Sequence, residues 1–188
     1  MNEGELATRG IDINGSYRLP LATAGSLLFT LVGTHLQSLQ TTPVTGLGSY
    51  DCVGYFGTLC GVVTPKWRHV LNATWSMPWH GVAVGLRWRY IGPSESALTN
   101  ASPFLSGTPY LPLAHIPAYN YFDLNGTIDL NKHFTLRLGV NNIADKAPPL
   151  VIGNDCLGTA GGLCNGNTFP GVYDAMGRYL FVNLSAQW

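Results

Sequence analysis

The sequence has few charged residues. Only 11% of its 188 residues are Asp, Glu, Lys or Arg, and the ten acidic groups balance the ten basic ones. Soluble domains carry about a quarter charged residues, so this shortage indicates that much of the surface does not face water. The balance of signs argues against a nucleic-acid partner, which would select a basic domain. The hydrophobic content of 46% excludes intrinsic disorder.

The sequence also lacks an apolar run of the roughly 20 residues that a transmembrane helix needs. The longest candidate, 19–36, is interrupted by six small or polar residues: Gly25, Ser26, Thr30, Gly33, Thr34 and His35. A closed β-barrel is the other structure that can cross a bilayer, because it leaves no backbone group unpaired in lipid. Residues 1–5 lack the features of an export signal, so we expect either a cytoplasmic protein or a sequence that begins within a longer one.

Motifs for covalent chemistry and for bound cofactors are missing. The sequence contains no G-x-S-x-G, no phosphate-binding or dinucleotide-binding glycine motif and no H-E-x-x-H, and its five histidines are scattered. We therefore expect no catalytic residue, no cofactor and no metal site. An outer-membrane lipase or protease is disfavoured for the same reason.

The four cysteines form two close pairs in Gly-rich stretches, Cys52 with Cys60 and Cys156 with Cys164. Neither pair has the C-x2-4-C spacing or the neighbouring histidine of a zinc site, so two local disulfides are predicted. Disulfides imply an oxidising compartment.

Polar and apolar residues alternate with a period of two, which is typical of β-strands. In 122–131 every polar side chain falls on one face, and 134–141 repeats this pattern after a tight turn at 131–133. Further strands are predicted at 5–19, 26–40, 67–76, 82–90 and 172–188.

The connections between these strands alternate in length. Short turns are predicted at 20–25, 77–79 and 131–133, and long loops at about 42–64, 92–118 and 149–170. Outer-membrane barrels follow this rule, whereas a soluble sandwich has no reason to place every long loop on one side. The sequence therefore predicts an all-β fold, an antiparallel transmembrane β-barrel segment of about seven strands forming a curved open sheet. Bacterial single-chain barrels have an even number of strands from about 8 upward, so we expect the seven to be part of a larger barrel.

The alternation also assigns side chains to the two faces of the sheet. The face predicted to line the lumen carries Arg68, Arg87, Arg89, Asp123, Asn125, Asp129 and Arg137. A positive lumen could attract anionic substrates. Alternatively, the arginines pair with Asp123 and Asp129 in a solvated wall. The strand ends are rich in aromatic residues, as expected of interfacial girdles: Trp67, Trp75, Trp79, Trp88 and Tyr90.

The run from Phe134 to Pro149, FTLRLGVNNIADKAPP, resembles the penultimate strand and following loop of TonB-dependent outer-membrane receptors. It departs from that family at Ala144, where Phe or Leu is commoner. The end of the sequence, 167–188, is similar to the closing strand of the same receptors, with Tyr-Asp at 173–174 and Gly-Arg at 177–178 in the expected places. The segment 65–69, PKWRH, resembles the opening of an upstream strand.

This resemblance implies energy-coupled uptake of a scarce nutrient, such as a ferric siderophore, across the outer membrane of a Gram-negative bacterium. Such a receptor has an N-terminal plug and a barrel of about 22 strands. Residues 1–188 would form the C-terminal portion of the barrel without the plug. The implied partners are outer-membrane lipid, the barrel-assembly machinery, the TonB energy-coupling complex reached through the plug, and a small-molecule substrate. A passive porin is one alternative, and a soluble β-sandwich binding module is another.

Trp188 ends the sequence, and Leu180, Val182 and Leu184 lie behind it on the same face of the predicted last strand. A terminal aromatic residue with alternating apolar positions resembles the signal that the barrel-assembly machinery recognises. A role for Trp188 in an interfacial girdle is the alternative, and both roles are compatible.

Overall fold

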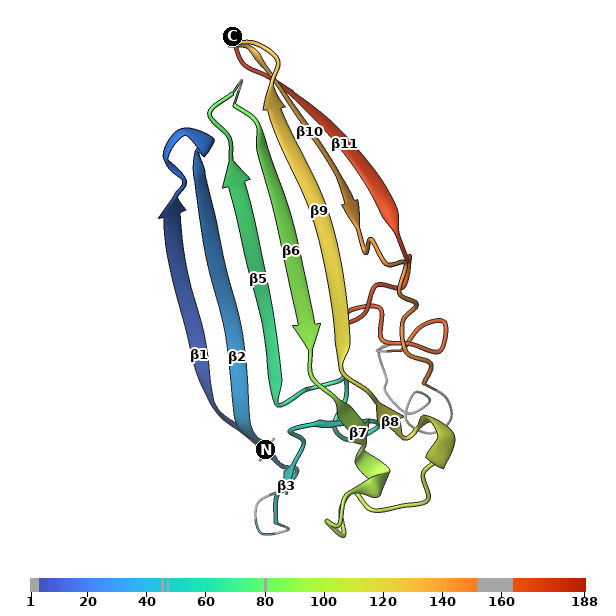
Figure 1. The fold of residues 1–188 in the computed structure, drawn as a ribbon. Helices are drawn as coiled ribbons and strands as arrows, with labels where there is room; N and C mark the ends of the chain where they lie inside the picture. Colours follow the sequence, from blue (N-terminus) through green and yellow to red (C-terminus); the bar gives the residue numbers. More distant parts are fainter. Residues whose placement is uncertain (1–3, 45, 47, 80, 152–163) are drawn as a thin grey trace.

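The computed structural model describes residues 4–44, 46, 48–79, 81–151 and 164–188, which form a curved antiparallel sheet with loops gathered at one end (Figure 1). The sheet has seven main strands: β1 (Glu5–Pro20), β2 (Ser26–Thr42), β5 (Trp67–Ser76), β6 (Ala83–Ile91), β9 (Tyr119–Asp129), β10 (Phe134–Asn141) and β11 (Tyr179–Ala186). They pair in chain order, and β1 and β11 form the two edges of the open sheet. The predicted fold class is confirmed.

Short turns join the strands at the end of the sheet opposite the loops (Figure 1). The β1–β2 turn contains the 3-10 helix η1 (Ala22–Ala24). In the β5–β6 turn the Met77 N–H donates to the Val82 carbonyl at 2.8 Å. In the β9–β10 turn the Asn131 side chain accepts from the backbone N–H groups of residues 133 and 134, at 2.8 and 3.0 Å. Asparagine favours such turns because its side chain can replace a backbone acceptor.

The long loops contain short elements that the sequence did not predict. β3 (Tyr50–Asp51) pairs with β2. A second, small sheet consists of β4 (Tyr55–Phe56), β7 (Ser94–Ser96) and β8 (His115–Ile116), and its β4–β7 pair is parallel. Two single-turn 3-10 helices, η2 (Ala97–Thr99) and η3 (Leu111–Leu113), lie between β7 and β8. Strands of two or three residues are too short to show a periodic pattern, which explains why they were missed. No helix in the described ranges has the length and apolar character needed to span a membrane.

The first two strands are longer than the others and contain a β-bulge. β1 has 16 residues and β2 has 17, against about 9–11 for a transmembrane strand. Their register shifts at Arg9/Gly10, and β5 pairs with β2 only as far as His35. Because a one-residue shift turns later side chains to the opposite face, Leu39 points into a cluster of loop residues. The bulge explains why alternation in these strands is less regular than in β9 and β10.

Buried hydrophobic side chains lie at the loop end of the molecule rather than along the strands. One cluster includes Phe56 and Phe169, whose rings meet edge to face at 5.7 Å, and a second includes Cys52 and Leu105. By contrast, the strand residue Leu138 is 48% exposed. Soluble proteins seldom expose large contiguous apolar patches. This distribution fits a sheet that faces lipid and loops that face water.

The first predicted disulfide, Cys52–Cys60, is present, with its Cα atoms 5.3 Å apart. The bridge links two residues eight positions apart in the loop between β3 and β5. Cys52 is buried in the cluster with Leu105. The second predicted pair includes Cys156, which lies outside the described residues, so the Cys156–Cys164 bridge stays a prediction.

Replacing both Cys52 and Cys60 with serine is expected to destabilise this loop by about 2 kcal/mol, because the short closed loop loses its constraint on the unfolded state. Limited proteolysis of the folded protein should then cut between β3 and β5 faster than in the wild type. The same protease should cut the β9–β10 turn at an unchanged rate. Equal cleavage of wild type and variant between β3 and β5 would show that the bridge does not hold this loop.

The last strand is shorter than predicted. The sequence indicated a strand over 172–188, but β11 spans only Tyr179–Ala186. Residues before it form turns: the backbone N–H groups of Val172 and Tyr173 both donate to the Phe169 carbonyl, at 2.9 Å each. Tyr173 is buried in the cluster with Phe56 and Phe169. The segment therefore folds back over the sheet instead of extending β11.

Candidate functional site

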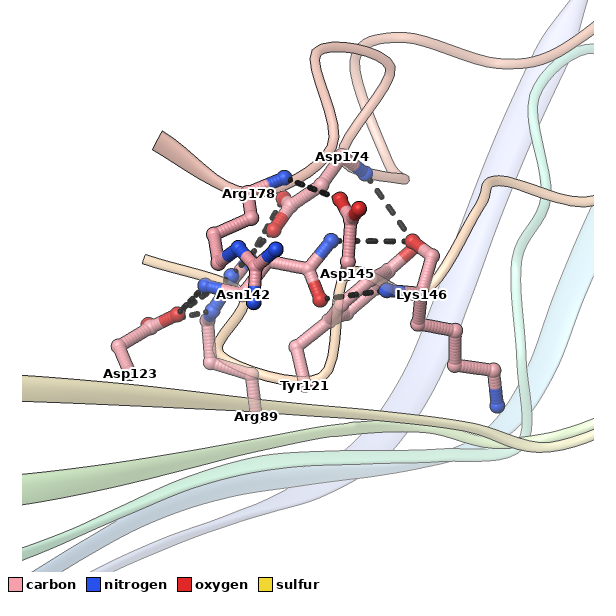
Figure 2. Close-up of polar contacts among 8 residues, drawn as sticks. All are labelled: Arg89, Tyr121, Asp123, Asn142, Asp145, Lys146, Asp174 and Arg178. Atoms are coloured by element: carbon pink, nitrogen blue, oxygen red, sulfur yellow. Dashed lines mark hydrogen bonds and ion pairs between the residues drawn. The ribbon is translucent and has the colours of Figure 1, made fainter. Parts of the chain in front are cut away.

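A polar cluster joins the sheet to the segment that precedes β11. Figure 2 shows its eight residues, which come from β6, from β9, from the turn after β10 and from the segment before β11: Arg89, Tyr121, Asp123, Asn142, Asp145, Lys146, Asp174 and Arg178. Residues up to 85 positions apart in the sequence meet here. The cluster is the most extensive side-chain hydrogen-bond network in the described part of the chain.

Arg89 binds two carboxylates at once. Its Nε and Nη2 atoms donate to Asp123 at 2.9 and 3.0 Å, and its Nη1 and Nη2 atoms donate to Asp174 at 2.9 and 2.5 Å. The side chains of Arg89, Asp123 and Asp174 are 25%, 5% and 19% exposed. The planar guanidinium group suits such paired contacts, which are stronger than neutral hydrogen bonds. We call Arg89, Asp123 and Asp174 the Arg89 clamp.

Tyr121 of β9 contacts two members of the clamp, Arg89 and Asp174. Its ring lies 4.9 Å from the Arg89 guanidinium carbon, and its hydroxyl oxygen accepts from the Asp174 backbone N–H at 3.3 Å. Tyr121 and Asp123 point to the same face because they are two residues apart on β9. β9 thus holds both Arg89 and the backbone of Asp174 in place.

Asn142 closes the turn that follows β10. It is buried and has a positive φ of 51°, a conformation that asparagine tolerates better than most residues. Its side chain accepts from the Lys146 backbone N–H at 2.9 Å and donates to the Lys146 carbonyl at 3.0 Å. Its own backbone N–H donates to Asp123 at 2.9 Å. Asp123 therefore holds both this turn and the Arg89 side chain in place.

Two further contacts attach the turn to the segment before β11. The Asp145 carboxylate accepts from the Arg178 backbone N–H at 2.8 Å. The Lys146 ammonium lies 4.1 Å from the centre of the Tyr119 ring, which in turn meets the Tyr173 ring at 4.9 Å. Burial raises the pKa of Tyr173 above its ordinary value, so this loop tyrosine stays neutral.

All seven residues predicted to line the lumen lie on one face of the sheet, which we call the polar face. The strand registers place Arg87 opposite Asp123, Asn125 opposite Gly85, and Arg137 opposite Thr127. Arg68 lies opposite Ile91, two residues from Arg89, and Asp129 lies opposite Thr135. The arginines were expected to pair with Asp123 and Asp129. Arg89 does pair with Asp123, whereas the Asp129 carboxylate accepts a hydrogen bond from the Thr135 hydroxyl at 2.8 Å.

The opposite face, which we call the apolar face, carries continuous rows of apolar residues across all seven strands. One row consists of Tyr17, Phe29, Ala73, Leu86, Leu124, Val140 and Leu180. The next row consists of Leu19, Leu27, Trp75, Val84, Gly126, Leu138 and Val182. On the polar face, by contrast, Arg87 donates to Asn72 and Asn72 donates to Thr30, each at 3.2 Å.

Aromatic residues mark both ends of the strands. At the loop end, His69 stacks on Tyr90 at 5.2 Å and accepts from the Trp67 indole N–H at 2.9 Å. At the turn end, Trp75 donates to the Ala24 carbonyl at 2.9 Å. The eight residues from Ala83 to Tyr90, seven steps of about 3.4 Å, span roughly 24 Å. That length is close to the apolar band of roughly 25 Å in outer-membrane barrels.

The predicted assembly residues lie on the apolar face at one edge of the sheet. Leu180, Val182 and Leu184 pair with Val140, Leu138 and Leu136 of β10. Trp188 is 99% exposed, with its ring 6.4 Å from that of Phe134. Their recognition by the assembly machinery stays a prediction.

Sequence reasoning found two of the three residues of the clamp and missed Asp174. It placed Arg89 and Asp123 on one face, but it took Asp174 to be part of the last strand and gave Tyr121 and Asn142 no role. The available signal was the glycine at 177, which has a positive φ of 69° and interrupts a strand. The described residues contain no group of three or more His, Cys, Asp or Glu that could hold a metal ion.

An open curved sheet with one apolar face, one polar face, aromatic strand ends and long loops at one end defines a wall segment of an outer-membrane-type β-barrel. The chain matches the family model for TonB dependent receptor-like β-barrels over residues 1–143 of 188, and it belongs to that family. The family serves outer-membrane transport in Gram-negative bacteria and is not a family of enzymes. The matched range ends before the segment that contains Asp174. No curated protein matches the chain.

Proposed function

We propose that this protein forms the C-terminal part of the barrel of a TonB-dependent receptor that takes up a scarce nutrient, such as a ferric siderophore. The observation that carries the proposal is the apolar face that runs in register across all seven strands, backed by an arginine-rich polar face. Lipid would cover the apolar face. The polar face would line the lumen, with Arg68, Arg87, Arg89, Asp123, Asn125, Asp129 and Arg137 directed into it.

The unpaired edges of the sheet support a larger barrel. β1 and β11 each have a strand partner on one side only in the described structure. An unpaired backbone group in lipid costs several kcal/mol, so a sheet in the membrane must close. Further strands of the receptor would pair with both edges, and a plug domain would occupy the lumen and contact the TonB complex.

The exposed row of Leu180, Val182, Leu184 and Trp188 supports a role in assembly. Leu180, Val182 and Leu184 lie on the edge strand β11 and Trp188 follows it, so the barrel-assembly machinery could bind them before the barrel closes. The Cys52–Cys60 disulfide supports export, because such bonds form in oxidising compartments.

Deleting the gene in its host is expected to abolish saturable, high-affinity uptake of a labelled ferric siderophore from the host's own set. The remaining uptake should be the same with and without a protonophore, whereas wild-type uptake should fall when the protonophore removes the energy supply. A plasmid copy should restore uptake. Uptake that rises linearly with substrate concentration and is unchanged by the protonophore would instead identify a passive porin.

A further inference from the structure

Three polar side chains form one row on the apolar face, at the loop end of the strands. His69 of β5 lies opposite Tyr90 of β6, and Tyr90 lies opposite Asn120 of β9. Side chains alternate along a strand, so each of the three shares its face with the residue four positions along its own strand, which belongs to the first apolar row: Ala73, Leu86 and Leu124. We call His69, Tyr90 and Asn120 the donor row.

The donor row lies in the interior of the described sheet. β5, β6 and β9 each have a strand neighbour on both sides (Figure 1). Further strands would add to the edges of the sheet, and a plug domain would lie against the polar face. Neither would cover the donor row, whose side chains are partly buried.

The Trp67 indole determines which nitrogen of His69 carries a proton. Its N–H donates to His69 Nδ1 at 2.9 Å. An indole nitrogen can only donate, so Nδ1 is the acceptor and the neutral imidazole carries its proton on Nε2. The Trp67 ring lies over Gly33 of β2, where a Cβ atom would come within 2.6 Å of it. His69 therefore presents an Nε2–H group that Trp67 does not use.

The Trp88 indole has the corresponding effect on Asn120. Its N–H donates to Asn120 Oδ1 at 2.8 Å, which leaves the two N–H donors of the Asn120 amide group. Between them, the Tyr90 ring stacks on His69 with the ring centroids 5.2 Å apart. His69 Nε2, the Tyr90 hydroxyl and Asn120 Nδ2 have no hydrogen-bond partner among the described residues, and none of them is a buried unpaired atom. All three donors therefore remain accessible on the outer side of the sheet.

The donor row lies at the boundary of the apolar band. Tyr90 is at the loop end of the segment of about 24 Å that reaches Ala83. In the next row toward the turn end, the Trp88 and Phe122 rings stack with their centroids 6.2 Å apart. A lipid has the same order of polar and apolar groups, with headgroup oxygens above the first carbons of its acyl chains. Aromatic side chains commonly occupy this level of a membrane protein.

We propose that His69, Tyr90 and Asn120 form a binding site for the phosphate-bearing headgroup of an outer-leaflet lipid. All three offer donors, and a charged phosphate forms stronger hydrogen bonds with donors than neutral oxygens do. Three adjacent strands span about 10 Å, which suits a phosphate together with neighbouring ester oxygens rather than a single small ion. The inference rests on the proposed function, which places a membrane against the apolar face.

The test is native mass spectrometry of the whole receptor, purified in detergent, freed of bound lipid and titrated with lipid A, a phosphorylated glycolipid. Tyr90→Phe removes one donor and keeps the ring. Asn120→Asp keeps an acceptor for Trp88 but replaces the two donors with a negative charge. Each variant should bind lipid A about tenfold more weakly than the wild type, or worse. Tyr17→Phe makes the same change as Tyr90→Phe near the turn end of the apolar face, and it should leave binding unchanged.

Two further probes separate the phosphate from the rest of the lipid. Lipid A from which the phosphates have been removed should bind the wild type about tenfold more weakly. Glucosamine 1-phosphate, which lacks acyl chains, should show no saturable binding over the same concentrations. All variants should keep the heat-dependent gel mobility of the wild type.

Equal binding of lipid A by the wild type and both donor-row variants, or equal binding of the two lipids by the wild type, would overturn the site. Tight binding of glucosamine 1-phosphate would overturn the assignment to a lipid. Lipid binding as expected without energy-dependent uptake would leave the site intact and remove the proposed transport function. Energy-dependent uptake by a receptor that does not bind lipid A would do the reverse.

Discussion

Substituting Leu138 with arginine is expected to destabilise the assembled barrel by about 2 to 4 kcal/mol. Leu138 lies on the apolar face in the middle of β10, between Gly126 of β9 and Val182 of β11. A guanidinium group there would face hydrocarbon, where it has no hydrogen-bond partner. Denaturant unfolding of the whole receptor, refolded into phospholipid vesicles, would measure the loss.

Thr135→Arg provides the matched control on the same strand. Thr135 lies on the polar face and donates to the Asp129 carboxylate at 2.8 Å. An arginine at this position can reach the same carboxylate, so its cost should stay below about 1 kcal/mol. Similar damage from both substitutions would contradict the assignment of the two faces.

Replacing Arg89 with methionine is expected to have the largest single effect, about 3 to 5 kcal/mol, since it leaves two largely buried carboxylates without their cation. Asp123 and Asp174 are only 5% and 19% exposed and would repel each other. The segment before β11 should then detach from the polar face. Denaturant unfolding would report the loss of stability, and hydrogen exchange at residues 165–178 would report the detachment.

Arg18→Met is the control, because Arg18 is an exposed arginine of β1 on the same face. It should change stability by less than about 0.5 kcal/mol. The double variant Arg89→Met with Asp174→Asn should recover part of the loss, because it removes one unpaired charge. Additive losses in this double-mutant cycle would mean that Arg89 and Asp174 do not interact in the folded receptor.

The regular strands and their faces could be predicted from the sequence because a β-strand has a side-chain period of two. Strands β5, β6, β9 and β10 were located within about three residues. The register of the β5–β6 and β9–β10 pairs then follows from their short turns, which leave little freedom in how the two strands pair. The position of Arg87 opposite Asp123 does not follow from a short turn, because the long loop 92–118 joins β6 to β9, and the tertiary structure sets that register.

The sequence alone thus determined what repeats locally: the alternation, the short turns, the closely spaced Cys52 and Cys60, and the two faces. Only the tertiary structure decided what depends on contacts between distant segments. Asp174 reaches Arg89 across 85 residues because the chain turns back at Phe169 and buries Tyr173, and nothing in the local pattern specifies that path. Local periodicity fixes where a side chain points, but packing fixes what it meets.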